Sequence, residues 1–510
     1  MRLTKPLVAL AAIAAVGAAS QAADALPIGV PSANPQVGTP PNVIVSTHQL
    51  DGVAQGSDPL ENPSGLITNY GHLSDGTLTE PDQNTYAVFP DGLGGPTQGY
   101  DYGTHFLFQG HENGGNLAYI TRINLDVSDP THRISLLTPV GNDGFTHLNS
   151  VDGSVYDPFT HTMLFTEEAG SSGGVIEIGP DGSNQRTLFG QIGQGGYEGI
   201  RPDNQGRLML DEDSGGVSVN VDPNDPNSPK AAKQPNSFLF RFTPKDRTDL
   251  SAGGKLEALQ VSIGGNPVTF HANDPVGDTF SNAQLLLNTP GLSWPVRWVT
   301  VHDTATDGSA PFSANALAKA AGATPFKRPE NGGFQPATGF RTYLFDATGD
   351  TNSDSGNVPA LAARGAWGTI FRVHLNAAAT RGRISVVALG DSTHNSFDTF
   401  SFTQKNEFLV GEDRGDGLHA QLNTLDSVWL YKLGDPNAER FIALGRDPVS
   451  LAHGEDNEPT GVNVTNGSTD PSTMFGTIDS LVNAKAFFTQ QHGENHTFQI
   501  VRNFTNSQKR

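Results

Sequence analysis

Residues 173–182 read GGVIEIGPDG, an apolar strand with one polar side chain that runs directly into a Pro-Asp-Gly turn. Glycine, proline and aspartate are the residues that most often form such turns. Similar units begin near residues 117, 237, 368 and 427. Successive units start about 60 residues apart, and one interval is about twice as long. This recurrence predicts an all-β protein built from repeated sheets.

A period of this length is typical of a β-propeller whose blades carry long loops. Two β-sandwiches are the alternative, but sandwich strands recur roughly every 8–12 residues and lack the longer period. We expect one propeller of about five or six blades over residues 64–510. Short helical insertions are predicted near residues 313–323 and 357–366. Residues 23–63, rich in proline and glycine, are expected to form an irregular strap.

The N-terminus has the pattern of a secretory signal peptide. Arg2 and Lys5 precede an apolar run over residues 7–19, and Ser20 and Ala22 are small residues suited to signal cleavage. A buried helix is the alternative, but no polar face interrupts the run, which is too short to span a bilayer. We therefore expect residues 1–22 to be a signal peptide and the mature protein to be secreted or periplasmic, without a membrane span.

The composition excludes several classes of function. The chain has 53 acidic and 31 basic residues and a formal charge of −22, so its surface repels nucleic acids and anionic membranes. It has no cysteine, which excludes disulfides, thiolate metal sites and a cysteine nucleophile. We expect a monomer that is held together by core packing, by bound metal or by both.

Acidic residues stand where many of the predicted apolar strands end. In a propeller, equivalent strand ends converge on one face of the central channel, so these carboxylates would repel one another unless cations bind between them. Oxygen ligands without thiolates favour Ca²⁺, Mg²⁺, Mn²⁺ or Fe³⁺ over zinc or copper. Each acid taken alone is equally compatible with an ordinary strand-end position. The acids in question include Glu112, Glu168, Glu198, Asp213, Glu330 and Glu458.

Several of these tracts, in this order, resemble the PhoX-type alkaline phosphatases (the DUF839 family). The resemblance runs from about residue 79 to residue 493 and covers most of the mature chain. The tracts include TEPDQNTYAVF (79–89), HFLFQGHENGG (105–115), TEE (166–168), YEG (197–199), DED (211–213), NSFLFRF (236–242), RPE (328–330), EPTG (458–461) and QHG (491–493). No single tract is specific for the family, but the occurrence of all of them in the family's order is.

The resemblance implies a propeller that hydrolyses phosphomonoesters at a central site containing iron and calcium. By position, the implied metal ligands are Glu168, Glu198, Glu330, Asp213 and Glu458, and Glu112 is a further candidate. Arg328 is implied to bind the substrate phosphate, a role that suits the planar fork of a guanidinium. A salt bridge with a neighbouring acid is the alternative role for Arg328.

The chain departs from the family in its metal ligands and its signal. Ser150 stands where the family has a cysteine that binds iron, and a hydroxyl is a much poorer iron ligand. The usual twin-arginine signal is also missing, because Arg2 stands alone. We therefore expect an all-oxygen centre rich in Ca²⁺, with Fe³⁺ in doubt.

These observations lead to the hypothesis of an exported, metal-dependent phosphatase acting on a small phosphorylated substrate. His111 or His492 would protonate the leaving alcohol, although either histidine is equally compatible with a structural role. The main alternative is a calcium-stabilised propeller that binds a ligand without catalysis. A propeller lactonase or dehydrogenase is a further alternative, but no feature of the sequence indicates one.

Overall fold

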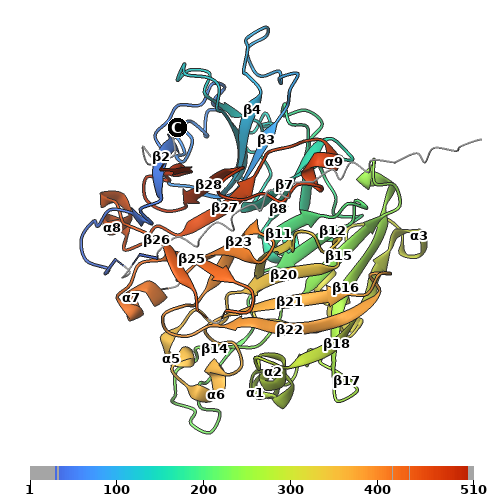
Figure 1. Cartoon of the computed structure of the whole chain (residues 1–510). Helices are drawn as coiled ribbons and strands as arrows, with labels where there is room; N and C mark the ends of the chain where they lie inside the picture. The colour runs from blue at the N-terminus through green and yellow to red at the C-terminus, as the bar shows by residue number, and fades with distance from the viewer. Residues whose placement is uncertain (1–28, 31–33, 416, 436, 504–510) are drawn as a thin grey trace, which may run out of the picture.

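The computed structural model describes residues 29–30, 34–415, 417–435 and 437–503 (Figure 1). The predicted signal peptide, residues 1–22, lies outside this part of the chain. Among the described residues, no helix combines the length and the apolar character that crossing a membrane requires. The fold is mostly β, as predicted, and its sheets are arranged radially around one axis.

Four separate sheets each make one blade. The first contains β3 (Glu80–Val88), β4 (His105–Glu112), β5 (Tyr119–Asn124) and β6 (Ile134–Leu136). The second contains β7 (Val151–Asp157), β8 (Thr162–Glu167), β9 (Val175–Ile178) and β10 (Arg186–Thr187). The third contains β23 (Phe397–Gln404), β24 (Glu407–Glu412), β25 (Ser427–Lys432) and β26 (Glu439–Ala443), with β1 (Val43–Ile44) at its edge. The fourth contains β27 (Pro459–Thr465), β28 (Lys485–Gln490), β29 (Thr497–Arg502) and β2 (His48–Ala54).

One ten-stranded sheet occupies the two remaining blade positions. One half has β11 (Tyr197–Pro202), β12 (Leu208–Glu212), β15 (Leu239–Pro244) and β16 (Gly254–Ile263), with the short β17 (Asn266–Pro267) beside β16. The other half has β19 (Pro329–Phe334), β20 (Thr342–Ala347), β21 (Thr369–Leu375) and β22 (Arg381–Leu389). The long strand β18 (Ser293–Asp303) pairs with both β16 and β22 and joins the halves.

The innermost strands form a closed ring. Each contacts the next around the axis in the order β3, β7, β11, β19, β23 and β27, and β27 returns to β3. The fold is therefore a propeller, as predicted, with two of its six blade positions merged at the periphery. Buried apolar clusters fill the space between blades; Phe108 and Phe165, for example, belong to one cluster between the first two sheets.

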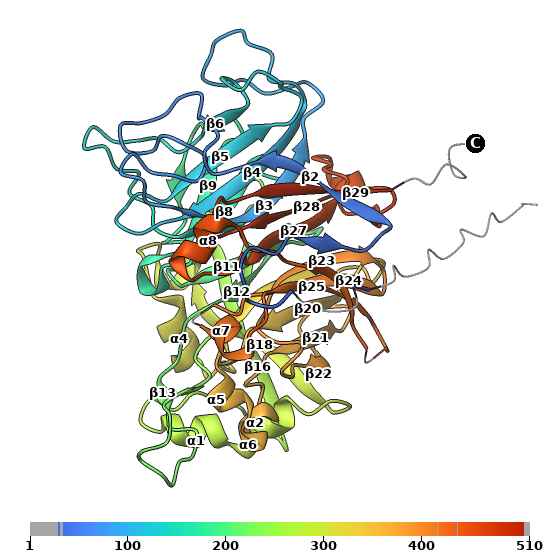
Figure 2. The same ribbon diagram turned by 90° about the vertical axis from the view of Figure 1, so that its left-hand side faces the viewer.

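The N-terminal strand closes the propeller. Strand β2 pairs with β29 near the C-terminus, and His48 lies opposite Arg502 in the register. Figure 2 shows these two strands side by side. Residues 23–63, expected to form an irregular strap, thus contain two strands, β1 and β2, that extend two different sheets. This part of the chain is more regular than its composition indicates.

The helices are short and lie in the connections between strands. The two predicted insertions contain α4 (Ala314–Ala320) and α6 (Pro359–Ala362). The other helices are α1 (Pro275–Phe280), α2 (Asn282–Leu287), α3 (Thr304–Asp307), α5 (Ser353–Gly356), α7 (Leu418–Leu422), α8 (Pro448–His453) and α9 (Pro471–Met474). Two 3₁₀ turns (Gly170–Ser172 and Leu250–Ala252) and the short β13 (Ser218–Val219) and β14 (Ala232–Lys233) complete the described elements.

Candidate active site

Every innermost strand has an irregular register close to its first residues. In β7, for example, Val151 pairs with Glu167, and regular pairing resumes only at Ser154. A bulge of this kind bends the strand and changes the direction of its side chains. Five of the six strands carry an acid at the first bulged position, and all five acids line one cavity. These acids are Asp82, Asp152, Glu198, Glu330 and Asp398.

The sixth strand, β27, differs from the others. Gly461 occupies its first bulged position with a φ of 59°, and a Cβ atom there would collide with Asn84. The acid of this blade, Glu458, stands directly before the strand and still lines the cavity.

A second set of side chains comes from the ends of the neighbouring strands. Residues at or just after the ends of β4, β8, β12, β24 and β28 reach the same cavity, namely Glu112, Glu168, Asp213, Asp413 and Gln491. The corresponding residue after β20 is Thr348, and its hydroxyl donates a hydrogen bond to Glu330. Two layers of polar side chains therefore surround one end of the channel.

The cavity has a volume of about 80 Å³ and is lined by ten carboxylates, Gln491 and Arg328. It contains all six acids that the sequence proposes as metal ligands, including Glu168, Glu198 and Glu330 from three different blades. Asp152 and Glu330 are almost completely buried, with exposed fractions of 1% and 2%. Ten carboxylates around one guanidinium, that of Arg328, repel one another. The arrangement is unfavourable unless the carboxylates are protonated or bind metal cations.

Burial and mutual repulsion both act on these acids. Burial, with the charges of Glu80 and Asp398, raises the pKa of Glu112 to about 8. Burial and the charge of Asp213 likewise raise the pKa of Glu330 to about 8, although Arg328 opposes the shift. The pKa values of Glu168, Glu198 and Glu458 are also raised well above the ordinary range by burial and neighbouring carboxylates. The cavity thus attracts protons or metal cations strongly.

Arg328 lies within this acidic cavity in a left-handed conformation, with a φ of 57°. Its Nε donates to Asp213 Oδ2 at 2.8 Å and lies 3.5 Å from Glu330 Oε1. Its Nη2 lies 4.0 Å from Asp413 Oδ2. Its Nη1 is buried and has no acceptor among the described residues. Arg328 therefore forms the salt bridge that the sequence left as an alternative and retains a donor for a ligand.

The carboxylates fit hard cations. Two groups of three residues each offer oxygen atoms within 4.8 Å of one another: Asp82, Glu112 and Asp152, and Glu198, Asp213 and Glu330. One oxygen each of Asp152, Asp213 and Glu330 is buried and accepts no hydrogen bond from any described residue. Unpaired carboxylate oxygens in close groups are the ligand set that Ca²⁺ prefers.

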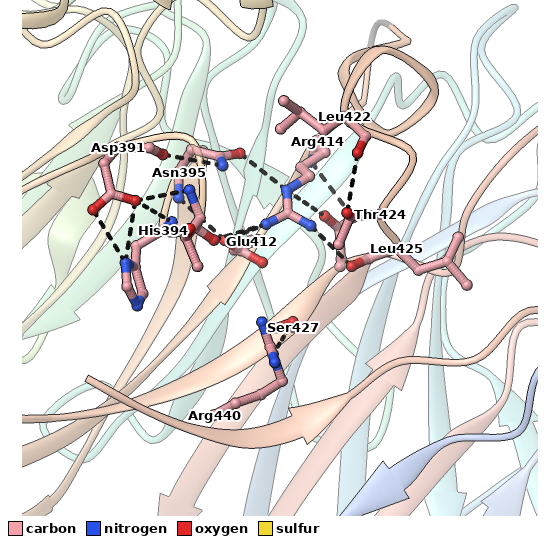
Figure 3. Close-up of polar contacts among 12 residues, drawn as sticks. Asp391, His394, Asn395, Glu412, Arg414, Leu422, Thr424, Leu425, Ser427 and Arg440 are labelled. Atoms are coloured by element: carbon pink, nitrogen blue, oxygen red, sulfur yellow. Dashed lines mark hydrogen bonds and ion pairs between the residues drawn. The ribbon is translucent and has the colours of Figure 1, made fainter. Parts of the chain in front are cut away.

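The buried Arg414 directly follows Asp413, and Figure 3 shows its contacts with Glu412, Asn395 and Leu425. Arg414 donates to Glu412 Oε1 at 2.8 Å, to Asn395 Oδ1 at 3.0 Å and to the carbonyl of Leu425 at 2.8 Å. The backbone N–H of Asp413 donates to the carbonyl of Ser396 at 2.8 Å. These bonds connect the end of β24 to the loop before β23 and fix the position of Asp413.

The two predicted histidines lie in different places. His111 is fully buried and stacks on Tyr119, and its Nε2 lies 2.8 Å from Thr121 Oγ1. It is not among the residues that line the cavity. His492 follows Gln491 and lines an adjacent pocket, where its Nδ1 is 3.6 Å from Asp456 Oδ1.

Some cavity residues were not among the metal ligands and catalytic residues predicted from the sequence. They are Asp82, Asp152, Asp398, Asp413 and Gln491. The first three share a signal with Glu198 and Glu330, because the bulged tracts PDQN, VDGS, YEGI, PENG and FDTF each have an acid as their second residue, near the start of an innermost strand. Ser150, where the family has a cysteine, precedes β7 and is not among the cavity-lining residues.

The fold and the cavity together define a propeller with a carboxylate-rich central site. Residues 217–418 match the family model described as alkaline phosphatase PhoX. The structure of Pseudomonas fluorescens PhoX in complex with vanadate, a transition state analogue, is similar, with a TM-score of 0.59 and 13% identity, covering 94% of this chain and 98% of that chain. A gluconolactonase from Xanthomonas campestris, XC5397, gives a TM-score of 0.33 at 10% identity, covering 89% of this chain and 100% of that chain. No curated protein sequence matches.

The match to the PhoX model and the similarity to a PhoX structure confirm the resemblance that the sequence motifs indicate. The match to the family model also supports a phosphatase-type enzyme. The low identity to the solved structure limits that comparison to the fold, so the chemistry of this chain depends on its own residues.

Proposed function

We propose that this chain is an exported, metal-dependent hydrolase of phosphomonoesters that uses a carboxylate-bound calcium centre. The observation that carries the proposal is the unpaired Nη1 donor of Arg328 inside a buried cavity of ten carboxylates. A guanidinium donor suits a phosphate oxygen, and a carboxylate cluster suits the cations that phosphoryl transfer requires.

Arg328 would orient the substrate. Its Nε is held by Asp213 at 2.8 Å, which fixes the plane of the guanidinium and directs the remaining donors. Nη1 would then donate to a phosphate oxygen, and the fixed geometry would stabilise the charge that develops on the equatorial oxygens. Arg328 has a left-handed backbone before Pro329, and it lines the cavity.

The carboxylates would hold the cations. One group comprises Asp82, Glu112 and Asp152, and the other comprises Glu198, Asp213 and Glu330. When bound, Ca²⁺ supplies charge neutralisation for the phosphate and lowers the pKa of a coordinated water. We favour Ca²⁺ over Fe³⁺ because the chain has no cysteine and its cavity offers oxygen ligands alone.

His492 is the candidate proton donor for the leaving alcohol. Burial alone would lower its pKa, but the nearby carboxylate of Asp456, 3.6 Å away, raises the pKa to about 9 and favours the protonated ring at neutral pH. It stands next to Gln491, at the border between the cavity and a neighbouring pocket of about 260 Å³ that would receive the alcohol.

Turnover of p-nitrophenyl phosphate tests the proposal. The full mature chain, purified without chelators, is assayed as isolated, after EDTA, and after addition of Ca²⁺ or Fe³⁺. We expect activity that EDTA abolishes and Ca²⁺ restores, and elemental analysis should find calcium in the active protein. If calcium raises the melting temperature but no condition gives turnover, the non-catalytic binding propeller is correct.

Export and oligomeric state are proposed from the sequence. Cell fractionation and N-terminal sequencing should find the mature protein outside the cytoplasm, beginning near residue 23. Light scattering during size-exclusion chromatography should give the mass of a monomer. The formal charge of −22 supports the absence of nucleic-acid binding.

A further inference from the structure

A second cavity lies at the other end of the central channel. Its volume is about 250 Å³, and it shares no lining residue with the acidic cavity. All six innermost strands contribute residues that follow their bulges. The connection between β19 and β20 and the segment between β27 and β28, including Met474 on α9, complete the lining. The strand residues are 84–87, 154–156, 201–202, 332–334, 400–402 and 463–465.

The cation of this cavity is Arg201, on β11. Its Nη1 donates to the carbonyl oxygens of Ile200 at 2.8 Å and Ser154 at 3.3 Å, and its Nη2 lies 3.5 Å from Gln83 Oε1. None of these acceptors is a carboxylate, and within the described part of the chain no carboxylate lies within ion-pair distance of Arg201. Arg201 is half-buried and its charge is met only by neutral oxygen acceptors, so an anion that enters the cavity would be attracted to it.

The two acids that act on Arg201 electrostatically have other partners. Asp211 Oδ2 accepts from the hydroxyl of Tyr343 at 2.6 Å, and Asp346 Oδ1 accepts from the backbone N–H of Asn331 at 2.9 Å. Neither acid lines the cavity, so the face of Arg201 that is open to the cavity meets no carboxylate from them.

Asn84 provides an independent indication of a ligand. Its side chain is 96% buried, it lines the same cavity, and its Oδ1 has no hydrogen-bond partner among the described residues. The amide nitrogen makes only a long contact, 3.4 Å, with Thr489 Oγ1. A buried acceptor left without a donor is unfavourable, and a hydroxyl group on the body of a ligand, separate from the group that meets Arg201, would satisfy it.

The walls around these polar groups are mainly apolar and aromatic. They include Tyr156, Phe334, Phe340, Phe402, Val464 and Phe475. One acid, Asp479, also lines the cavity, and its Oδ1 accepts from Asn466 Nδ2 at 3.0 Å. An apolar cavity of about 150 Å³ is large enough to bind benzene, so this one has room for a ring and a short polar substituent.

We propose that this cavity binds a small organic acid, with its carboxylate on Arg201 and its ring or alkyl body against the aromatic wall. The site is separate from the acidic cavity and takes no part in hydrolysis. A charge-assisted hydrogen bond to Arg201 would provide selectivity for an anion over a neutral amide of the same shape.

Isothermal titration calorimetry with two probes of equal shape tests this inference on the full mature chain. Phenylacetate carries the carboxylate, and phenylacetamide is its neutral analogue. We expect phenylacetate to bind about 10- to 100-fold more tightly, because the amide cannot form the charged pair with Arg201. Arg201→Met should remove this preference and leave phenylacetamide binding unchanged. Arg186→Met is the control, because Arg186 is an exposed, ion-paired residue outside the cavity.

A second variant keeps the test independent of the folding of Arg201→Met. Met474 is half-buried and lines the cavity, so Met474→Trp should fill the space and weaken both probes without removing the charge. Equal affinity of wild type for the two probes, or no detectable binding of either at millimolar concentration, would overturn the inference. Phenylacetate should leave p-nitrophenyl phosphate turnover unchanged; competitive inhibition would instead place it in the acidic cavity.

Discussion

The two ends of the propeller channel are built from the same six strands but have opposite character. At the end where the strands begin, ten carboxylates surround Arg328, and five of them stand in the bulges of the innermost strands. Further along the same strands, amides, hydroxyls and aromatic rings surround Arg201. The difference shows that the acidic site depends on two features of the strand ends. The bulges contribute one acid from each of five blades, and the ends of the neighbouring strands contribute most of the others.

The largest expected effect separates the two arginines. Arg328→Met should lower kcat/KM for p-nitrophenyl phosphate by about 10²- to 10³-fold, because it removes a fixed donor to the developing phosphate charge. Arg201→Met should leave kcat/KM unchanged, because Arg201 lines only the other cavity. Steady-state kinetics with saturating Ca²⁺ measures both variants. Equal losses would mean that the two ends act as one site.

The bulges also predict where the ring of innermost strands has no space for a larger side chain in place of a glycine. Gly153 lies in the bulge of β7, and a Cβ atom there would collide with the backbone carbonyl of Glu198 on the next blade. Gly153→Ala should therefore lower the free energy of unfolding by about 1–3 kcal/mol.

The matched control comes from the other end of the channel. A Cβ atom on Gly333 would meet only ring atoms of Phe400 and Phe402 at 3.3–3.4 Å, which have room to adjust. Gly333→Ala should change the free energy of unfolding by less than about 1 kcal/mol. Urea denaturation of the two variants measures the difference, and an equally large loss for Gly333→Ala would contradict a close approach confined to the bulged end.

Much of the acidic site is predictable from strand ends. Glu112 and Glu168 stand where apolar runs stop, and a propeller places such ends together. Asp82, Asp152 and Asp398 lie in bulges, where the two-residue alternation that marks a strand is interrupted. Glu198 and Glu330 also lie in bulges, but the family tracts YEG and RPE identified them. Bulges depend on contacts between blades, so periodicity along one strand does not locate them.

The larger topology was predictable only in outline. The recurring strand unit indicates a propeller, and the one interval of double length falls within the ten-stranded sheet. The sequence does not indicate that β18 joins two blades there, because this depends on long-range pairing with β16 and β22. The closing strand β2 (HQLDGVA) was also missed, since it carries few apolar residues and gains its order by pairing with β29.

The two ends should also differ in their response to pH. Burial raises the pKa of Glu112 and of Glu330 from 4.5 to about 8, so without metal the folded protein binds more protons than the unfolded chain between pH 4.5 and 8. The free energy of unfolding of the EDTA-treated protein should therefore fall as pH rises through this range, by up to about 1.4 kcal/mol per pH unit for each group.

Calcium should reduce this dependence, because a bound cation favours the charged carboxylates. Urea denaturation at several pH values, with EDTA or with Ca²⁺, measures the slope. Glu112→Gln should make the slope in EDTA shallower, while Arg201→Met, at the other end of the channel, should leave it unchanged. A slope that is flat in EDTA would show that these acids do not titrate as the cavity predicts.

The smallest expected effect concerns His111, which precedes Glu112 on β4 but does not line the cavity. Burial lowers the pKa of His111 well below its ordinary value, so the ring is neutral, and it is held by Thr121 and by stacking on Tyr119. His111→Phe keeps the stacking and removes one hydrogen bond, so the free energy of unfolding should fall by about 1 kcal/mol. Turnover should remain at the wild-type level, because alternate residues of a strand face opposite sides and only Glu112 reaches the substrate end of the channel. A loss of turnover comparable to that of Arg328→Met would instead make His111 part of the catalytic site.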